Sequence, residues 1–222
     1  GASDVMSVIT IERKILEKND EVAAVNRDAL VRHGVYAINM VSSPGAGKTT
    51  LLERTLAELQ GRIRVAVVEG DVQTDLDAQR VARYGVPVVQ IVTNGGCHLE
   101  ARLVHDALRQ IDLATTDLLV IENVGNLVCP ANFDLGEAVK VVVLSVTEGD
   151  DKPLKYPAMF ARASVLVINK VDLLPYVSFD LALFRADVER LHPGVPVLEV
   201  SATTGHGMGA WLDWLLGRAG RG

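Results

Sequence analysis

The sequence predicts an α/β protein in which a largely parallel sheet of about seven strands is flanked by helices. Short runs rich in β-branched and apolar residues alternate with stretches of helical periodicity along the whole chain. The short runs are almost uniformly apolar, as in strands that are covered by helices on both faces. In such sheets ligands gather at the carboxyl ends of the strands, so functional residues are expected directly after the apolar runs.

The first expected element is an amphipathic helix over residues 8–33. Its apolar residues recur at roughly helical spacing among charges: Val8, Ile11, Ile15, Val22, Val25, Ala29 and Leu30. We expect this helix to cover the sheet or a partner. Gly1, Ala2 and Ser3 resemble the remnant of a cleaved tag, and residues 1–7 are expected to form a disordered start.

The expected strands follow in order, and each is a short apolar run. They are 36–41, 64–68, 86–92, 118–121, 139–146, 165–168 and 195–200. A closing helix is expected from Gly207 to Leu216, with Trp211 and Trp214 in the core. Because no repeat, low-complexity stretch or flexible linker divides the chain, residues 1–222 are predicted to form a single domain.

Composition excludes several classes of function. The 22 basic and 28 acidic residues give a net charge of −6, which argues against a broad nucleic-acid-binding surface. The sequence contains no apolar run near the ~20 residues that a membrane-spanning helix needs, and no secretory signal pattern. We therefore expect a cytoplasmic protein without nucleic-acid or membrane partners.

A phosphate-binding loop follows the first strand. It reads Ser42-Ser43-Pro44-Gly45-Ala46-Gly47-Lys48-Thr49, with Thr50 opening a helix, and Ser42 replaces the usual first glycine. Gly45 and Gly47 allow the backbone N–H groups around Ala46 to point at phosphates. Lys48 is expected to lie along the β and γ phosphates, and Thr49 to bind Mg²⁺. The fold class is therefore that of the P-loop NTPases.

The base is expected to be guanine, so the ligands are GTP and GDP. Asn169-Lys170-Val171-Asp172 follows an apolar strand. The Asp172 carboxylate can accept hydrogen bonds from the N1–H and the exocyclic amine of guanine, a donor pair that adenine lacks. Ser201 and Ala202, after the last strand, resemble the loop in which a backbone N–H meets the guanine carbonyl. A P-loop kinase is disfavoured, because Asn169 and Asp172 would have no role there.

Acidic residues after two other strands are candidates for magnesium binding and catalysis. Glu122 can orient a water on Mg²⁺, and the Gly125 N–H can meet the γ phosphate; the alternative is an acid that merely ends the strand. Asn126 stands where Ras-like GTPases have glutamine, which predicts slow intrinsic hydrolysis. Asp71 and Asp75 are expected to contribute to Mg²⁺ binding, and Asp75 is also expected to take part in catalysis. At least one acid among these two and Asp77 is expected to be only a helix N-cap.

The two cysteines are candidate metal ligands. Cys97-His98 opens an expected helix, and Cys129 follows the Glu122 segment. Two thiolates and an imidazole suit Ni²⁺ or Zn²⁺, and two chains would complete a four-coordinate site. The alternative is two unrelated buried thiols and a surface histidine.

The order of these motifs resembles the HypB family of hydrogenase nickel-insertion GTPases from Val8 to Leu216. The segments Gly-Gly-Cys-His-Leu-Glu-Ala and Ile-Glu-Asn-Val-Gly-Asn-Leu-Val-Cys-Pro are the most specific. The resemblance implies a GTP-hydrolysing metallochaperone, a GTP-dependent homodimer that holds Ni²⁺ or Zn²⁺ through Cys97, His98 and Cys129. It also implies that Lys152 couples the nucleotide to dimerisation. The implied partners are the large subunit of nickel-iron hydrogenase and a small metal-binding maturation protein.

The chain departs from parts of this family pattern. It contains neither the N-terminal cysteine motif nor the histidine-rich tract of some members, and His105 is expected to be a helix-surface residue. The urease-type nickel GTPases carry Cys-Pro-His, whereas this chain has Cys129-Pro130-Ala131. That family remains an alternative, as does a GTP-dependent regulatory switch that carries no metal. A metallochaperone for cobalamin-dependent enzymes is disfavoured.

Overall fold

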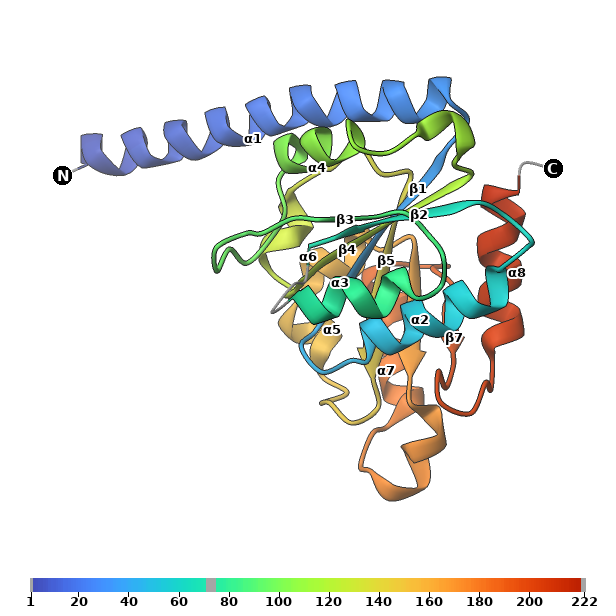
Figure 1. The fold of residues 1–222 in the computed structure, drawn as a ribbon. Coiled ribbons are helices and arrows are strands. Elements are labelled where there is room, and N and C mark those ends of the chain that lie inside the picture. Colours follow the sequence, from blue (N-terminus) through green and yellow to red (C-terminus); the bar gives the residue numbers. More distant parts are fainter. Residues whose placement is uncertain (1, 71–74, 221–222) are drawn as a thin grey trace.

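The computed structural model describes residues 2–70 and 75–220. Within them seven strands form one sheet of order β3-β2-β4-β1-β5-β6-β7, and every neighbouring pair is parallel (Figure 1). The strands are β1 (Tyr36–Ser42), β2 (Val65–Glu69), β3 (Val88–Gln90), β4 (Leu118–Gly125), β5 (Val139–Ser145), β6 (Val165–Asn169) and β7 (Val197–Glu199). The predicted parallel α/β fold is confirmed.

The helices alternate with these strands along the chain. They are α1 (Ala2–Arg32), α2 (Lys48–Leu59), α3 (Asp75–Ala82), α4 (Ala101–Leu108), α5 (Lys152–Lys155), α6 (Pro157–Arg162), α7 (Leu181–Leu191) and α8 (Met208–Ala219). Short 3₁₀ helices are η1 (Leu113–Thr115), η2 (Cys129–Asn132) and η3 (Val171–Tyr176). The predicted closing helix is α8, and Trp211 lies fully buried in the core.

Three strands differ markedly in length from the prediction. The two at the edges of the sheet are shorter than expected, and one at its centre is longer. The edge strands β3 and β7 have three residues each, because an edge strand finds ladder partners on one side only. Central β4 pairs on both sides and extends to Gly125, beyond the expected end at Ile121. This extension carries the chain from Glu122 directly toward Cys129.

The two faces of the sheet are covered by different helices. On one face α2, α3 and α8 pack against residues such as Ile38 and Val67. On the other face α1 and α4 cover one half of the sheet, and α6 and α7 cover the other half. These two halves form separate apolar clusters, and polar residues of β1 and β4 lie between them.

Helix α1 differs from its prediction in where it begins and in which face it buries. It starts at Ala2 instead of Val8, since no glycine or proline interrupts the sequence from Ala2 to Arg32; the expected disordered start is therefore helical. Its first half projects past the body of the domain, and its second half lies along α4 (Figure 1). Ile11 and Ile15 are exposed, whereas Asn19, Ala23, Asn26 and Leu30 are buried. The packed face of α1 is thus partly polar.

The buried asparagines of α1 hold two loops together. Asn19 accepts a hydrogen bond from the Ala101 N–H (2.8 Å) and donates to the Asp134 carbonyl (2.8 Å). Asn26 donates to the carbonyls of Ala101 (3.0 Å) and Leu135 (3.0 Å). Gly136, with φ +96°, permits the close approach, because a Cβ there would lie 2.7 Å from the Asn26 Cβ. Helix α1 therefore joins the loop before α4 to the loop before β5.

We expect Asn26→Ala to lower the free energy of unfolding by about 2–4 kcal/mol, because it removes two buried hydrogen bonds, to the carbonyls of Ala101 and Leu135. Chemical denaturation of the purified chain measures this change. Asp28→Ala, at an exposed position two residues along the same helix, should stay within about 0.5 kcal/mol of the parent. Equal losses in both variants would contradict a clamping role for Asn26.

None of the helices in the described part of the chain combines the length and the apolar character needed to cross a membrane.

Candidate functional site

The glycine-rich loop lies between the end of β1 and the start of α2. Gly45 and Gly47 both have φ +81°, a left-handed conformation that side chains rarely adopt. Residues 42–50 and Gly125 line a cavity of about 200 Å³. The loop backbone wraps this cavity at the N-terminus of α2, which is the arrangement that binds phosphate groups.

The Asn169-Lys170 segment packs directly on this loop. Asn169 Nδ2 donates to the Ala46 carbonyl (3.1 Å), and Lys170 Nζ donates to the Gly45 carbonyl (2.9 Å). Asn169 Oδ1 accepts from the Ala202 N–H (3.1 Å). A Cβ on Gly47 would lie 2.7 Å from Asn169 Nδ2. Three segments that are distant in sequence therefore meet at the phosphate loop, as predicted for one nucleotide site.

Asp172 lies in the first turn of η3, and its side chain is exposed. η3 begins directly after Lys170, whose backbone has the left-handed φ of +63°. Ser201, by contrast, is fully buried, and its hydroxyl accepts from the Thr204 N–H (3.1 Å).

Glu122 lies next to the phosphate loop. Its Oε1 accepts a hydrogen bond from the Thr49 hydroxyl (2.7 Å), and the whole residue is buried. Oε2 is also buried and has no hydrogen-bond partner among the described residues. A threonine hydroxyl beside a carboxylate with a vacant acceptor is a donor set that suits Mg²⁺. Of the acids after β2, Asp71 lies outside the described residues, and Asp75 and Asp77 are in the first turn of α3.

A second buried acid at this edge escaped the sequence analysis. Glu69 ends β2, is 1% exposed and pairs in register with Glu122 on β4. The signal in the sequence is an acid that closes the uniformly apolar run of residues 65–68. Two carboxylates on adjacent strand ends concentrate negative charge beside the phosphate loop, which favours a divalent cation there.

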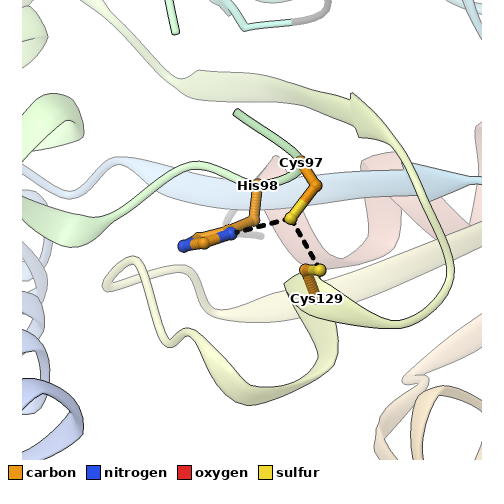
Figure 2. Close-up of side chains that lie close together, drawn as sticks. All are labelled: Cys97, His98 and Cys129. Carbon is orange, nitrogen blue, oxygen red and sulfur yellow. Dashed lines mark hydrogen bonds between the residues drawn. The ribbon is translucent and has the colours of Figure 1, made fainter. Parts of the chain in front are cut away.

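Cys97, His98 and Cys129 meet in one cluster, with their ligand atoms all within 4.8 Å of one another (Figure 2). The Cys97 and Cys129 Sγ atoms are 2.6 Å apart, and Cys97 Sγ lies 3.4 Å from His98 Nδ1. Cys97 and His98 come from the loop that leads into α4, and Cys129 opens η2 after β4. All three residues are half-buried. The structure thus brings together the three predicted ligands, which sequence separation had kept apart.

Neighbouring side chains fix the orientation of His98. Its ring stacks on Phe133 with a centroid distance of 4.0 Å, and its Nε2 lies 3.7 Å from a Glu100 carboxylate oxygen. If Nδ1 bound a metal, Glu100 would hold the opposite ring nitrogen, as carboxylates commonly do for metal-binding histidines. His105, predicted to lie on the helix surface, is half-buried, with Nδ1 3.2 Å from Asn26 Oδ1. His105 therefore contributes to the contact between α4 and α1.

The thiol pair predicts how metal binding depends on pH. The pKa of Cys97 is raised, first by its hydrogen bond with Cys129 and then by burial. A raised thiol pKa means that the proton is still bound at neutral pH and that a metal must displace it. Metal affinity should therefore increase with pH, by about tenfold per pH unit for each proton displaced.

Dissociation constants for Ni²⁺ measured between about pH 6 and about pH 8 test this dependence. Cys97→Ser removes one displaceable proton, so its profile should be shallower than that of the parent by one proton. A flat parent profile would contradict thiolate ligation.

Lys152 begins α5, on the loop that follows β5. Its Nζ lies 5.5 Å from the centroid of the Tyr156 ring, and the residue is half-buried. A lysine amine over an aromatic face is held by the ring's negative face. Lys152 is thus oriented by the residue that directly follows its own helix.

Comparison with known proteins agrees with this geometry. Residues 36–199 match the family described as "CobW/HypB/UreG, nucleotide-binding domain". The hydrogenase maturation factor HypB of Azotobacter vinelandii is 55% identical over 209 residues, which are 94% of this chain and 69% of that protein. The HypB of Escherichia coli K12 is 50% identical over 208 residues, covering 94% of this chain and 72% of that protein.

Two solved structures share the whole fold. The hydrogenase maturation factor HypB of Archaeoglobus fulgidus has a TM-score of 0.85 and 40% identity, covering 90% of this chain and 98% of that one. HypB from Helicobacter pylori, solved in complex with nickel, has a TM-score of 0.86 and 40% identity, covering 91% and 95%. With its phosphate loop, its Asn169-Lys170-Val171-Asp172 segment and its Cys-His-Cys cluster in one fold, this chain belongs to the HypB family of P-loop nucleotide-binding proteins.

Proposed function

We propose that this protein is a GTP-hydrolysing metallochaperone that carries Ni²⁺, or Zn²⁺ in its place, and assists nickel insertion into nickel-iron hydrogenase. The observation that carries the proposal is that Cys97, His98 and Cys129 lie together in one cluster. Cys129 belongs to the segment that leaves the nucleotide site after Glu122. Two thiols and an imidazole favour these ions over the hard cations that phosphate sites bind. The names of the relatives support hydrogenase as the recipient.

The nucleotide is GTP, and hydrolysis to GDP and phosphate is slow. Lys48 and the loop amides hold the phosphates, Asp172 reads the guanine edge, and Thr49 with Glu122 binds Mg²⁺. Asp75 remains the candidate acid near the attacking water. No glutamine follows Gly125, so the chain supplies Asn126 where Ras-like enzymes position water.

The carrier acts as a GTP-dependent homodimer. Three ligands per chain leave a four-coordinate ion incomplete, and the half-buried cluster is open to a second copy. Val92 (65% exposed) and Val128 (58% exposed) lie on the two segments that carry the cysteines. Exposed apolar side chains beside an incomplete site favour a protein interface. Lys152, at the start of the helix that follows β5, is the residue through which nucleotide state favours dimerisation.

Hydrolysis is coupled to the metal through β4. Glu122 lies at the phosphate loop, and Cys129 lies seven residues further along the same strand and its following turn. A change at the γ phosphate therefore reaches a metal ligand through a short segment. The expected partners are the hydrogenase large subunit and a small metal-binding maturation protein.

Equilibrium dialysis with Ni²⁺ tests the carrier function. The parent chain should bind nickel, and Cys129→Ala should lose about a hundredfold in affinity, because one of two thiolates is removed from a small ligand set. His33→Ala, at an exposed histidine at the end of α1, is the matched control and should bind like the parent. Equal binding by the parent and Cys129→Ala would instead favour a regulatory switch that carries no metal.

A further inference from the structure

Buried polar residues lie between the two apolar clusters on the α1 face of the sheet. Asn39 on β1 and Asn123 on β4 are at most 1% exposed, and Lys140 on β5 is 7% exposed. The Glu137 side chain, just before β5, is 8% exposed. These four residues, called here the polar seam, are not used by the nucleotide or metal chemistry described above. Buried polar groups are kept where each has a partner, so the contacts of the seam define its role.

Asn123 connects the phosphate loop to the segment that carries Cys97 and His98. Its main-chain carbonyl accepts a hydrogen bond from the Lys48 ammonium. Its side-chain Oδ1 accepts from the N–H of Leu99, the residue directly after His98, at 3.3 Å. Leu99 is fully buried, so its N–H has no access to water as a substitute partner. One residue thus contacts both the phosphate-binding lysine and one half of the metal cluster.

The other three residues of the polar seam connect Asn123 to the segment that carries Cys129. Asn123 Nδ2 donates to Asn39 Oδ1 (3.1 Å), and Asn39 Nδ2 donates to Glu137 Oε1 (3.4 Å). Lys140 Nζ lies 3.6 Å from the same Glu137 oxygen. It also donates to the carbonyl of Pro130 (3.3 Å), the residue directly after Cys129. Both metal-bearing segments are therefore bonded, at positions adjacent to their ligands, to one buried network that begins at Lys48.

We propose that Asn123 is a positioning residue that couples the nucleotide site to both halves of the metal cluster. This inference rests on the proposed carrier function and deepens it. The γ phosphate attracts the Lys48 ammonium, which also donates a hydrogen bond to the Asn123 carbonyl. The strength of that hydrogen bond therefore depends on which nucleotide is bound. Since the side-chain bonds of Asn123 are buried, the Leu99 and Pro130 segments follow its movement instead of exchanging partners with water.

The test compares Ni²⁺ affinity with GDP and with a nonhydrolysable GTP analogue, each with Mg²⁺, on the full chain. The two affinities of the parent should differ by about tenfold, a usual strength for coupled sites. Asn123→Ala, which keeps the carbonyl and removes the side-chain bonds, should bring the two affinities within about twofold of each other. Asn123→Ser is a milder variant that carries the test if the alanine variant does not fold.

Asn19→Ala is the matched control. Asn19 is also a buried asparagine that bonds to both metal-bearing loops, at Ala101 and Asp134, but within the described residues its bonds do not reach the phosphate loop. It should weaken nickel binding by the same factor with either nucleotide and leave the ratio intact. Loss of the ratio in Asn19→Ala to the same extent would show that any loosening of the loops uncouples the sites, and would overturn the proposal for Asn123.

Hydrogen exchange of the Leu99 amide gives a readout without metal. Its exchange rate should differ between GDP and the GTP analogue in the parent, and this difference should disappear in Asn123→Ser. A parent that binds no nickel but shows this nucleotide-dependent exchange would refute the carrier function and leave the coupling role of Asn123 standing. A folded Asn123 variant that keeps the parent's nucleotide-dependent difference in both readouts would overturn the inference.

Discussion

Asp172→Asn should lose its preference for GTP and bind xanthosine triphosphate instead. The aspartate offers two acceptors to the N1–H and exocyclic amine of guanine, whereas asparagine offers one acceptor and one donor. Xanthine presents N1–H and a carbonyl in place of the amine, which matches asparagine. GTP affinity should fall by about a thousandfold, because a site built for a hydrogen-bonded group rejects an unmatched one strongly.

Titration of the variant with fluorescent analogues of GTP and xanthosine triphosphate measures both changes. Asp213→Asn, an exposed aspartate on α8, is the control and should bind GTP like the parent. Unchanged GTP affinity in Asp172→Asn would mean that η3 does not carry the base-reading carboxylate. The guanine assignment would then fail.

Gly47→Ala should weaken GTP binding by more than about a hundredfold, because two costs add. An alanine at φ +81° is strained by about 1–2 kcal/mol. Its Cβ would also lie 2.7 Å from Asn169 Nδ2 and 3.3 Å from Lys170 Cε. Relieving that overlap displaces the segment that precedes Asp172, so the phosphate loop and the Asn169–Asp172 segment are disturbed together.

Gly45→Ala separates these two costs. Gly45 has the same φ of +81°, but a Cβ there would meet nothing within 4 Å. This variant should therefore show the backbone strain without the overlap, a loss of about tenfold. Isothermal titration with GTP on both variants gives the comparison. Equal losses would show that the contact between Gly47 and Asn169 has no part in nucleotide affinity.

The local motifs could be predicted from the sequence because their chemistry depends on short spacing. The phosphate loop and Asn169-Lys170-Val171-Asp172 each follow an apolar run, and parallel strands bring such ends to one edge. The convergence of Cys97 with Cys129 needed the strand order, which periodicity does not give. It was expected from the family resemblance, whereas the residues by themselves left two unrelated thiols as an equal alternative.

That α1 covers the sheet follows from its pattern, but which of its faces is buried could not be predicted. Helical periodicity counts apolar residues, and it favoured the side of α1 that carries Ile11 and Ile15, both of which are exposed. The buried face of α1 is the one that carries Asn19 and Asn26, because these side chains form hydrogen bonds with main-chain groups of distant segments. The same holds for Asn123, whose partners lie on other strands and loops. Buried polar contacts of this kind depend on tertiary structure.

The meeting of Ala46, Asn169 and Ala202 has a consequence for biosynthesis. The side chain of Asn169 is fixed on one side by the phosphate loop and on the other by an amide close to the C-terminal helix. A growing polypeptide on the ribosome cannot complete this arrangement until Ala202 has left the exit tunnel. A polypeptide that stops short of Ala202 therefore lacks one of the two contacts that fix the Asn169 side chain against the phosphate loop.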